Sequence, residues 1–277
     1  MVTVPEIIVI SFLSGLIGSL TGLGGASLTT PTLVALGVPV KHAIASGVLS
    51  VIATSSGSSS SYVRDRITNL RAAMFLEVFA IPGGAFGALV TIVVSPKLVA
   101  LVFSGVIASS VLITKLLGNG HDRRAVEQDR VSSWLNLRGS YYDASEGRTV
   151  HYRITNALYG GAGMVGAGTV AGMLGIGAGA FKVAVHELIL HMPPKVSTTT
   201  SNLIMGMTAL AGASVYVSSG LMSLELAVPL ALGTTLGSVL GSRVLRRLHD
   251  RHVRTMYFAV ATLASLLMLY RAFALGE

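Results

Sequence analysis

The sequence predicts an all-α integral membrane protein built from two inverted repeats, each with a glycine-broken helix and half-helix followed by three transmembrane helices. Three observations favour this fold. Of the 277 residues, 52% are hydrophobic and only 12% are charged, whereas soluble domains carry about 25% charged residues. Eight apolar stretches approach or exceed the roughly 20 residues that a membrane helix needs. Two of these stretches are interrupted by glycine clusters in equivalent parts of the two halves.

The expected helices follow the apolar stretches in chain order. These stretches are residues 5–36, 42–63, 69–94, 98–117, 153–191, 196–218, 224–242 and 255–275. The first and fifth, at 32 and 39 residues, are too long for one simple crossing. Glycine clusters interrupt them at 22–25 and 175–179. Each is therefore expected to form a helix, a break and a half-helix, the latter at 26–36 and 180–190.

The two halves of the chain repeat each other. With an offset of 153, Gly22-Leu23-Gly24 aligns with Gly175-Ile176-Gly177. With an offset of 154, the aligned pairs are Pro39 and Pro193, Lys41 and Lys195, Tyr62 and Tyr216, Gly83 and Gly237, and Gly87 and Gly241. Glycine and proline recur in any membrane helix, but matching lysine and tyrosine favour a duplicated unit. We expect a first transmembrane repeat at 1–117, a linker at 118–152 and a second repeat at 153–277.

The distribution of Lys and Arg predicts that the two repeats have opposite orientations. If each broken stretch crossed once, the loops would divide these residues 11 to 8, with Lys182 inside the membrane. If each instead returns to its starting side or crosses twice, the division is 16 to 3. Cytoplasmic loops carry an excess of Lys and Arg. We therefore expect a multi-pass protein of the cell (inner or plasma) membrane, with a cytoplasmic 118–152 loop and both termini outside.

The linker at 118–152 is the one long polar segment of the sequence. Tyrosine and valine alternate on either side of 143–147, which predicts a short β-hairpin. A linker at the cytoplasmic surface is the simpler interpretation, and a regulatory or partner-binding role is the alternative.

The two breaks are the strongest candidates for a binding site. Non-helical backbone inside a membrane must be buried in protein or line an aqueous cavity. A helix N-terminus presents unpaired N–H groups and a partial positive charge, which together bind anions. Glycine allows close approach because it has no Cβ; the alternative is that these glycines only permit tight helix packing. The expected binding residues are Gly24, Gly25, Ala26 and Ser27 in the first break and Gly177, Ala178 and Gly179 in the second.

Hydroxyl and amide side chains follow both half-helices. Ser46 lies near the start of the stretch 42–63, and Thr200, Ser201 and Asn202 lie near the start of 196–218. Such neutral groups can replace part of an anion's hydration shell. They also bond within their own helices, so some are expected to be structural. Asn202 is the best single candidate because a buried amide needs partners.

Ionisable residues at membrane depth are costly and usually functional. Lys182 is a candidate to attract the anion, and His186 or Glu187 to couple proton movement. Alternatively, Lys182 pairs with Glu187 or extends to the cytoplasmic face. Glu77 either carries a proton or lies as a carboxylate near the Arg71 end of its helix.

Several of these motifs resemble the sulfite exporter TauE/SafE family of membrane proteins. The resemblance is carried by Gly18-x3-Gly22-Leu23-Gly24-Gly25, Pro31 and Gly83-Gly84-x2-Gly87, with their copies in the second repeat, and it covers nearly the whole chain. It implies transport of sulfite, organosulfonates such as sulfoacetate, or related sulfur oxyanions, driven by an ion gradient. The chain departs from the family pattern at Gly177-Ala178-Gly179, which stands in place of a glycine pair, and at Lys182.

The expected function is a secondary transporter, an exporter of a small sulfur-containing anion such as sulfite or an organosulfonate. Alternating access would operate around a site between the two half-helix N-termini. An anion channel of the same fold and a non-transporting membrane scaffold are the alternatives. No enzyme is expected, because the sequence has no metal motif and no nucleophile–base pair at telling spacing. The expected partners are the anion, a coupling proton and the bilayer, with no cofactor, metal or nucleic acid; the oligomeric state stays open.

Overall fold

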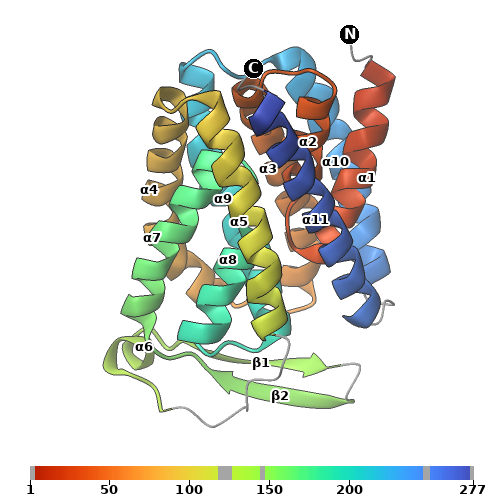
Figure 1. Cartoon of the computed structure of the whole chain (residues 1–277). Helices are drawn as coiled ribbons and strands as arrows, with labels where there is room; N and C mark the ends of the chain where they lie inside the picture. The colour runs from red at the N-terminus through yellow and green to blue at the C-terminus, as the bar shows by residue number, and fades with distance from the viewer. Residues whose placement is uncertain (1–3, 118–126, 144–146, 246–249, 275–277) are drawn as a thin grey trace.

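The computed structural model describes residues 4–117, 127–143, 147–245 and 250–274. Its helices are α1 (Val4–Thr21), α2 (Ala26–Ala35), α3 (Val40–Arg64), α4 (Leu70–Val93), α5 (Pro96–Leu117), α6 (Arg130–Trp134), α7 (Ala157–Leu174), α8 (Gly179–Ala184), the π-helical turn η1 (Val185–Ile189), α9 (Pro194–Ser218), α10 (Leu224–Leu245) and α11 (Asp250–Ala274). The strands are β1 (Arg138–Asp143) and β2 (Arg148–Arg153). Figure 1 shows the long helices side by side in one bundle, with the two strands at one end.

Helices form at all eight predicted stretches, and both long stretches break where their glycines cluster. The ends of the helices differ by a few residues from the prediction. α11, for example, begins at Asp250 rather than near residue 255. Polar residues extend such helices beyond their apolar stretches because a helix end at the membrane surface no longer needs apolar side chains.

The outer helices have the composition of membrane spans. Helices α1, α4, α5, α7 and α10 each contain an 18-residue window with a mean hydropathy of at least 1.3. Large apolar side chains such as Met74, Val78 and Phe86 lie on the surface of α4 and are at least 60% exposed. Contiguous apolar surface of this kind suits lipid rather than water.

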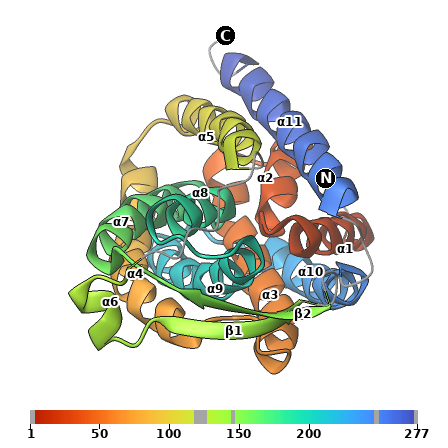
Figure 2. The same cartoon turned by 90° about the horizontal axis from the view of Figure 1, so that it is seen from below.

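Helices α3 and α9 lie against each other inside the bundle (Figure 2). Their serine and threonine side chains are largely buried, because α10 also packs on α3 and α4 on α9. The helices with the most serine and threonine residues therefore lie where the other helices largely shield these residues from lipid.

Corresponding helices of the two halves pack in exchanged pairs. α1 packs on α10, while α7, the counterpart of α1, packs on α4, the counterpart of α10. Similarly, α3 packs on α10 and α9 on α4, and α5 packs on α11. α1 runs from the far end of the bundle towards the hairpin, and α7 runs away from the hairpin (Figure 1). This is the arrangement expected of two halves with opposite orientations.

Glycines allow the paired helices to cross closely. A Cβ added to Gly87 on α4 would lie 2.0 Å from the carbonyl oxygen of Thr169 on α7. One added to Gly237 on α10 would lie 2.0 Å from the carbonyl oxygen of Phe12 on α1. The repeated glycines of α4 and α10 therefore permit the same close contact in each half.

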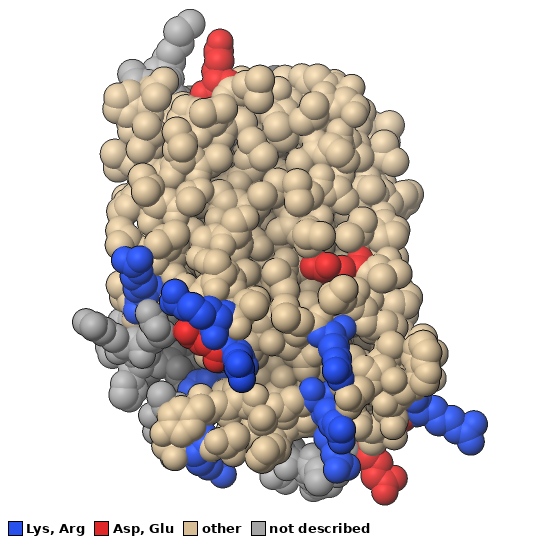
Figure 3. Space-filling view, turned by 180° about the vertical axis from the view of Figure 1, so that it is seen from behind, with Lys and Arg blue, Asp and Glu red and all other residues tan. Residues whose placement is uncertain are grey.

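The two ends of the bundle differ in charge. On the face shown in Figure 3, the Lys and Arg side chains gather in the lower part, towards the hairpin. Lys41, Lys97 and Arg271 lie at the opposite end, in the first turns of α3 and α5 and the last turn of α11. α1 begins and α11 ends at that same opposite end. Of the basic residues used to predict orientation, Arg123, Arg124, Arg246 and Arg247 lie outside the described residues.

The predicted hairpin is present in the linker. β1 and β2 pair antiparallel, with Arg138 opposite Arg153 and Asp143 opposite Arg148. The Asp129 carboxylate joins the linker to the start of α7, because it accepts a hydrogen bond of 2.7 Å from the Asn156 N–H. Partial burial raises the pKa of Asp129, but hydrogen bonds from Ser132 and Asn156 outweigh burial and bring it below its usual value.

Candidate functional site

The two glycine breaks meet inside the bundle. α1 is separated from α2 by residues 22–25, and α7 from α8 by residues 175–178. A Cβ added to Gly24 would lie 3.3 Å from the carbonyl oxygen of Ile176, and one added to Gly179 would lie 2.0 Å from that of Gly22. Breaks from opposite halves of the chain therefore contact each other, and they do so through backbone.

The breaks follow similar backbone paths. Gly22 and Gly24 have φ angles of 72° and 80°, and their counterparts Gly175 and Gly177 have 62° and 75°. These left-handed conformations favour glycine. Ala178 also has a positive φ, of 47°, although a side chain makes this conformation costly by about 1–2 kcal/mol. At the equivalent position of the first break, Gly25 has a helical φ of −59°, so the two paths differ at their last residue and the second break ends on a strained one.

Hydrogen bonds within the protein occupy most of the N–H groups in the first turn of α2. The Gly25 N–H donates to Thr54 Oγ1 at 3.0 Å, and the Ser27 and Leu28 N–H groups donate to the carbonyl oxygens of Gly24 and Gly25 at 3.2 Å. The Ser27 hydroxyl also donates to the Gly24 carbonyl oxygen, at 2.8 Å. Its hydrogen is therefore committed to the backbone. Ala26 is fully buried in the same turn, and its N–H has no acceptor among the described residues.

The first turn of α8 is less completely bonded. The Phe181 and Lys182 N–H groups donate to the carbonyl oxygen of Ala178 at 3.1 Å. The N–H groups of Gly179 and Ala180, the first two residues of α8, have no acceptor among the described residues. α8 continues directly into η1, so the helical segment runs from Gly179 to Ile189. The start of α8 thus has two unpaired N–H groups among the described residues, whereas the start of α2 has one, that of Ala26.

Asn202 contributes further unpaired polar atoms beside this N-terminus. The residue is fully buried, and neither its Nδ2 nor its Oδ1 has a hydrogen-bond partner among the described residues. On the same stretch of α9, Ser201 Oγ donates to the carbonyl oxygen of Gly179 at 3.5 Å. A buried polar group without a partner costs about 1–3 kcal/mol. Such a group indicates a place for a water molecule or a ligand.

The other predicted hydroxyl groups differ in their surroundings. Ser46 is fully buried and its Oγ has no partner among the described residues. Thr200 Oγ1 instead accepts a 3.1 Å hydrogen bond from the Asn69 N–H, at the start of α4. Ser46 therefore keeps a free hydroxyl for a ligand, whereas Thr200 holds two helices together.

Lys182 points into the protein rather than out of it. Its side chain is fully buried and Nζ donates to Thr208 Oγ1 at 3.0 Å. Glu77 of α4 attracts this amine electrostatically, but no carboxylate of the described residues lies within 4.0 Å of it. The interpretation that Lys182 pairs with Glu187 or extends to the cytoplasmic face is therefore wrong. The reason is the direction of helical side chains, which lean towards the helix N-terminus.

The remaining ionisable candidates lie around α8. His186 on η1 is fully buried, with Nδ1 3.2 Å from the carbonyl oxygen of Ser197. Glu187 is half-exposed on the same turn, and Glu77 is half-buried on α4. Arg71 lies within hydrogen-bond range, 3.5 Å, of the carbonyl oxygen of Asn136. Glu77 is therefore linked electrostatically to Lys182 and not to Arg71.

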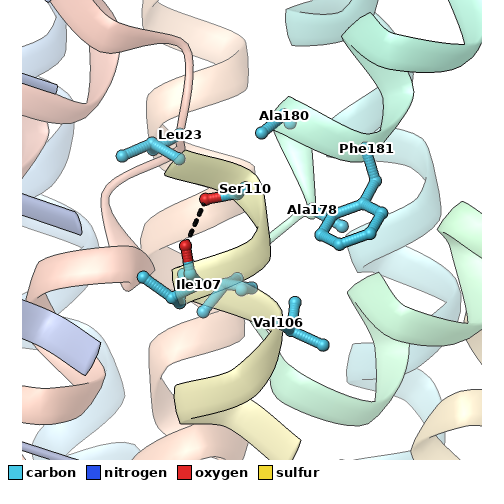
Figure 4. Close-up of a pocket in the computed structure, with 9 residues that line it drawn as sticks. Leu23, Val106, Ile107, Ser110, Ala178, Ala180 and Phe181 are labelled. Atoms are coloured by element: carbon cyan, nitrogen blue, oxygen red, sulfur yellow. Dashed lines mark hydrogen bonds between the residues drawn. The ribbon is translucent and has the colours of Figure 1, made fainter. Parts of the chain in front are cut away.

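A small cavity adjoins the two breaks. Its volume is about 10 Å³, and its lining includes Leu23 of the first break, Ala178 of the second and Ile107 of α5 (Figure 4). Such a volume holds about one water molecule. A hollow of about 340 Å³ lies elsewhere, between α4 and α9, and opens to the surface around Leu89 and Ser218. The breaks therefore pack closely in this conformation, and an anion between them would require the halves to separate.

The sequence analysis missed two threonines that are part of the site. Thr54 Oγ1 accepts a hydrogen bond from the Gly25 N–H of the first break. Thr208 Oγ1 accepts one from the Lys182 amine beside the second break. The two residues are separated by the repeat offset of 154. That equivalence was the available signal, because a residue type recurring at the repeat spacing marks the same place in each half.

The buried polar helices, the apolar outer helices and the two glycine breaks inside the bundle are typical of a membrane transporter. The profile of the family described as sulfite exporter TauE/SafE matches residues 7–268, and the chain belongs to this family. The predicted resemblance and the all-α membrane fold are thereby confirmed.

Two relatives from Bacillus subtilis (strain 168) match almost end to end. The probable membrane transporter protein YunE is 24% identical over 272 residues, which cover 95% of this chain and 96% of the relative. The probable membrane transporter protein YdhB is 24% identical over 266 residues, covering 95% and 99%. No solved structure matches the chain. The family and both relatives are membrane transporters, so the chain is a multi-pass membrane transporter and not an enzyme.

Proposed function

We propose that the protein is a secondary transporter that exports a small sulfur-containing anion, such as sulfite or an organosulfonate, from the cell. The observation that supports this most is the meeting of the two breaks beside Asn202, whose amide is buried and unpartnered. The free N–H groups of Gly179 and Ala180 supply further donors at the start of α8. A helix N-terminus of this kind favours negative charge without needing a charged side chain in contact with it.

The proposed site combines backbone and side-chain donors. Its residues are Gly24, Gly25, Ala26, Ser27, Ser46, Gly177, Ala178, Gly179, Thr200, Ser201 and Asn202. The second break and Asn202 would make the direct hydrogen bonds, and Ser46 would add a hydroxyl. Ser27 and Thr200 would shape the site, because their hydroxyl groups already bond to protein. A sulfite or sulfonate group presents three oxygens that accept hydrogen bonds, which suits several donors converging from different elements.

Transport would occur by alternating access. The exchanged helix pairs support two halves of opposite orientation that rock about the central site. The small cavity at the breaks is expected in a closed conformation, in which neither side admits the anion. In this proposal the hairpin end is cytoplasmic, both termini lie outside, and a proton is the coupling ion.

The proposed function is tested with purified protein in lipid vesicles. Uptake of sulfite, sulfoacetate, sulfate and simple carboxylates is measured as separate anions. We expect saturable uptake of sulfite or sulfoacetate and little uptake of carboxylates. Flux that rises linearly with concentration would instead favour the channel alternative, and absence of uptake of every anion would favour a non-transporting scaffold.

A further inference from the structure

The amine of Lys182 is incompletely paired. Nζ donates to Thr208 Oγ1, and the Thr208 hydroxyl in turn donates to the carbonyl oxygen of Ile204 at 2.9 Å. An ammonium group has three N–H donors, and no second acceptor for Lys182 lies among the described residues. Because the side chain is fully buried, water cannot supply the missing partners from bulk solution. A full positive charge is therefore poorly compensated when the site is empty.

Two other titratable groups face this amine. Glu77 approaches from α4 and attracts a positive charge on Lys182. His186 approaches from η1, and a positive charge on Lys182 opposes one on His186. Neither forms an ion pair with the amine within 4.0 Å. Lys182 thus has one distant counter-charge and no direct one.

The amine lies close to the second break. Met205 Sδ lies 2.8 Å from the position of a Cβ added to Gly177 and 3.2 Å from one added to Gly179. Thr208, which holds the amine, follows Met205 by three residues on α9. Residues three apart on a helix are neighbours at about 5–6 Å. An anion at the second break would therefore lie near enough to supply the missing counter-charge.

We infer that Lys182 is the group that couples proton movement to anion transport. In this scheme, which rests on the proposed function, the neutral amine accepts a proton from hydronium at the open side when the anion binds: an O–H bond breaks, water is released and an N–H bond forms at Nζ. The ammonium and the anion then cross the barrier together. When the anion leaves on the other side, the N–H bond breaks and the proton passes to water there. Proton and anion therefore move in the same direction. A divalent anion with one proton carries net negative charge, so the inside-negative membrane potential drives export in the cell, whereas an acid exterior without that potential drives uptake.

This assignment differs from the expectation that His186 or Glu187 couples the proton. His186 Nδ1 is already close to the Ser197 carbonyl oxygen, and Glu187 lies on η1 beyond α8. Among the described residues, only Lys182 combines full burial and an ionisable group with a hydrogen bond to Thr208, which lies one turn of α9 from the Met205 contact with the break.

Sulfoacetate is the probe for the test, because its sulfonate and carboxylate both stay ionised between about pH 6.5 and pH 8. Vesicles carry wild-type protein, Lys182→Met, Lys182→Arg, Thr208→Val, or the matched control Lys97→Met, whose lysine is exposed at the start of α5. Two readouts are compared: accumulation driven by an acid exterior, and exchange of labelled for unlabelled sulfoacetate at saturating concentration without a gradient. A monodisperse gel-filtration profile in detergent shows that each variant is folded.

Wild type and Lys97→Met are expected to accumulate sulfoacetate at least tenfold over the no-gradient level. Lys182→Met and Lys182→Arg should lose this accumulation but retain exchange, because neither side chain cycles between charged and neutral forms. Thr208→Val should shift the pH dependence of accumulation while preserving exchange.

Three results would overturn the coupling role. They are gradient-driven accumulation retained in Lys182→Met, loss of exchange together with accumulation in that folded variant, and wild-type uptake that ignores the pH gradient. If sulfite crosses and sulfoacetate does not, Lys182→Met and Lys97→Met are compared with sulfite instead. Both variants are measured with the same inside and outside pH values, so that sulfite's own titration is identical for the two variants. Failure of every anion to cross with wild-type protein contradicts the proposed function itself, so the two failures are distinguishable.

Discussion

The first and second breaks share a backbone path but differ in what occupies their polar groups. In the first, Thr54 accepts the Gly25 N–H. In the second, the equivalent Thr208 accepts the amine of Lys182, and the N–H groups of Gly179 and Ala180 stay free. A duplicated fold has therefore kept two matching breaks while only one retains several free donors and a nearby charge. We therefore propose that the second break makes the main contact with the anion and that the first provides a packed surface opposite it.

The largest expected effect comes from filling the contact between the breaks. A side chain at Gly179 would meet the carbonyl oxygen of Gly22 at 2.0 Å, so Gly179→Val should lower transport at least a hundredfold. The matched control is Gly166→Val on α7, where an added Cβ meets nothing within 4 Å. Uptake is measured with equal amounts of folded protein in vesicles. Equal activity of the two variants would contradict a site at the breaks.

Removal of the Asn202 amide should have the next largest effect. A hydrogen bond to a charged group contributes about 1.5–3 kcal/mol, so Asn202→Ala should weaken anion affinity roughly tenfold to hundredfold. The variant should fold at least as well as the wild type, because the amide has no partner in the empty site. Affinity is measured by anion-dependent thermal stabilisation in detergent. Unchanged affinity would place the anion away from α9.

Loss of Thr54 should separate stability from binding at the first break. Thr54→Val removes the acceptor of the Gly25 N–H, which should lower the free energy of unfolding by about 1–3 kcal/mol. Transport by the folded fraction should change less than threefold, because the second break makes the main contact. A transport loss as large as that of Asn202→Ala would show that the two breaks contribute equally.

Ser27→Ala should have the smallest effect. Its hydroxyl donates to the Gly24 carbonyl oxygen rather than towards the second break, so uptake should stay within about twofold of wild type. The net contribution of such a hydrogen bond to stability is about 1 kcal/mol. A large loss of uptake would show that this hydroxyl changes partners when the anion binds.

The orientation of the halves can be tested independently of transport. The chain has no native cysteine, so single cysteines can be labelled cleanly. Asp65→Cys and Ser219→Cys occupy equivalent loops, since 219 − 65 equals the repeat offset of 154, and both residues are exposed. A membrane-impermeant thiol reagent should label them from opposite faces. Labelling from the same face would exclude the inverted repeat.

Hydropathy and glycine spacing were sufficient to predict the helices and the two breaks, and alternating tyrosine and valine predicted the hairpin. These features depend on local sequence, because apolar length sets a membrane helix and glycine clusters interrupt it. The direction of Lys182, the commitment of the Ser27 hydroxyl and the roles of Thr54 and Thr208 were not predictable in this way. They depend on how each helix is rotated against its neighbours, which hydropathy constrains poorly when most residues of α3 and α9 are buried.

The central claim is tested most directly by an experimental structure of the protein with sulfite bound, determined under conditions in which uptake has been measured. We expect the anion between the breaks, with its oxygens about 3 Å from the Gly179 nitrogen and from Asn202 Nδ2. An anion bound elsewhere in the bundle, with the two breaks still in contact and Asn202 still unpartnered, would contradict the account.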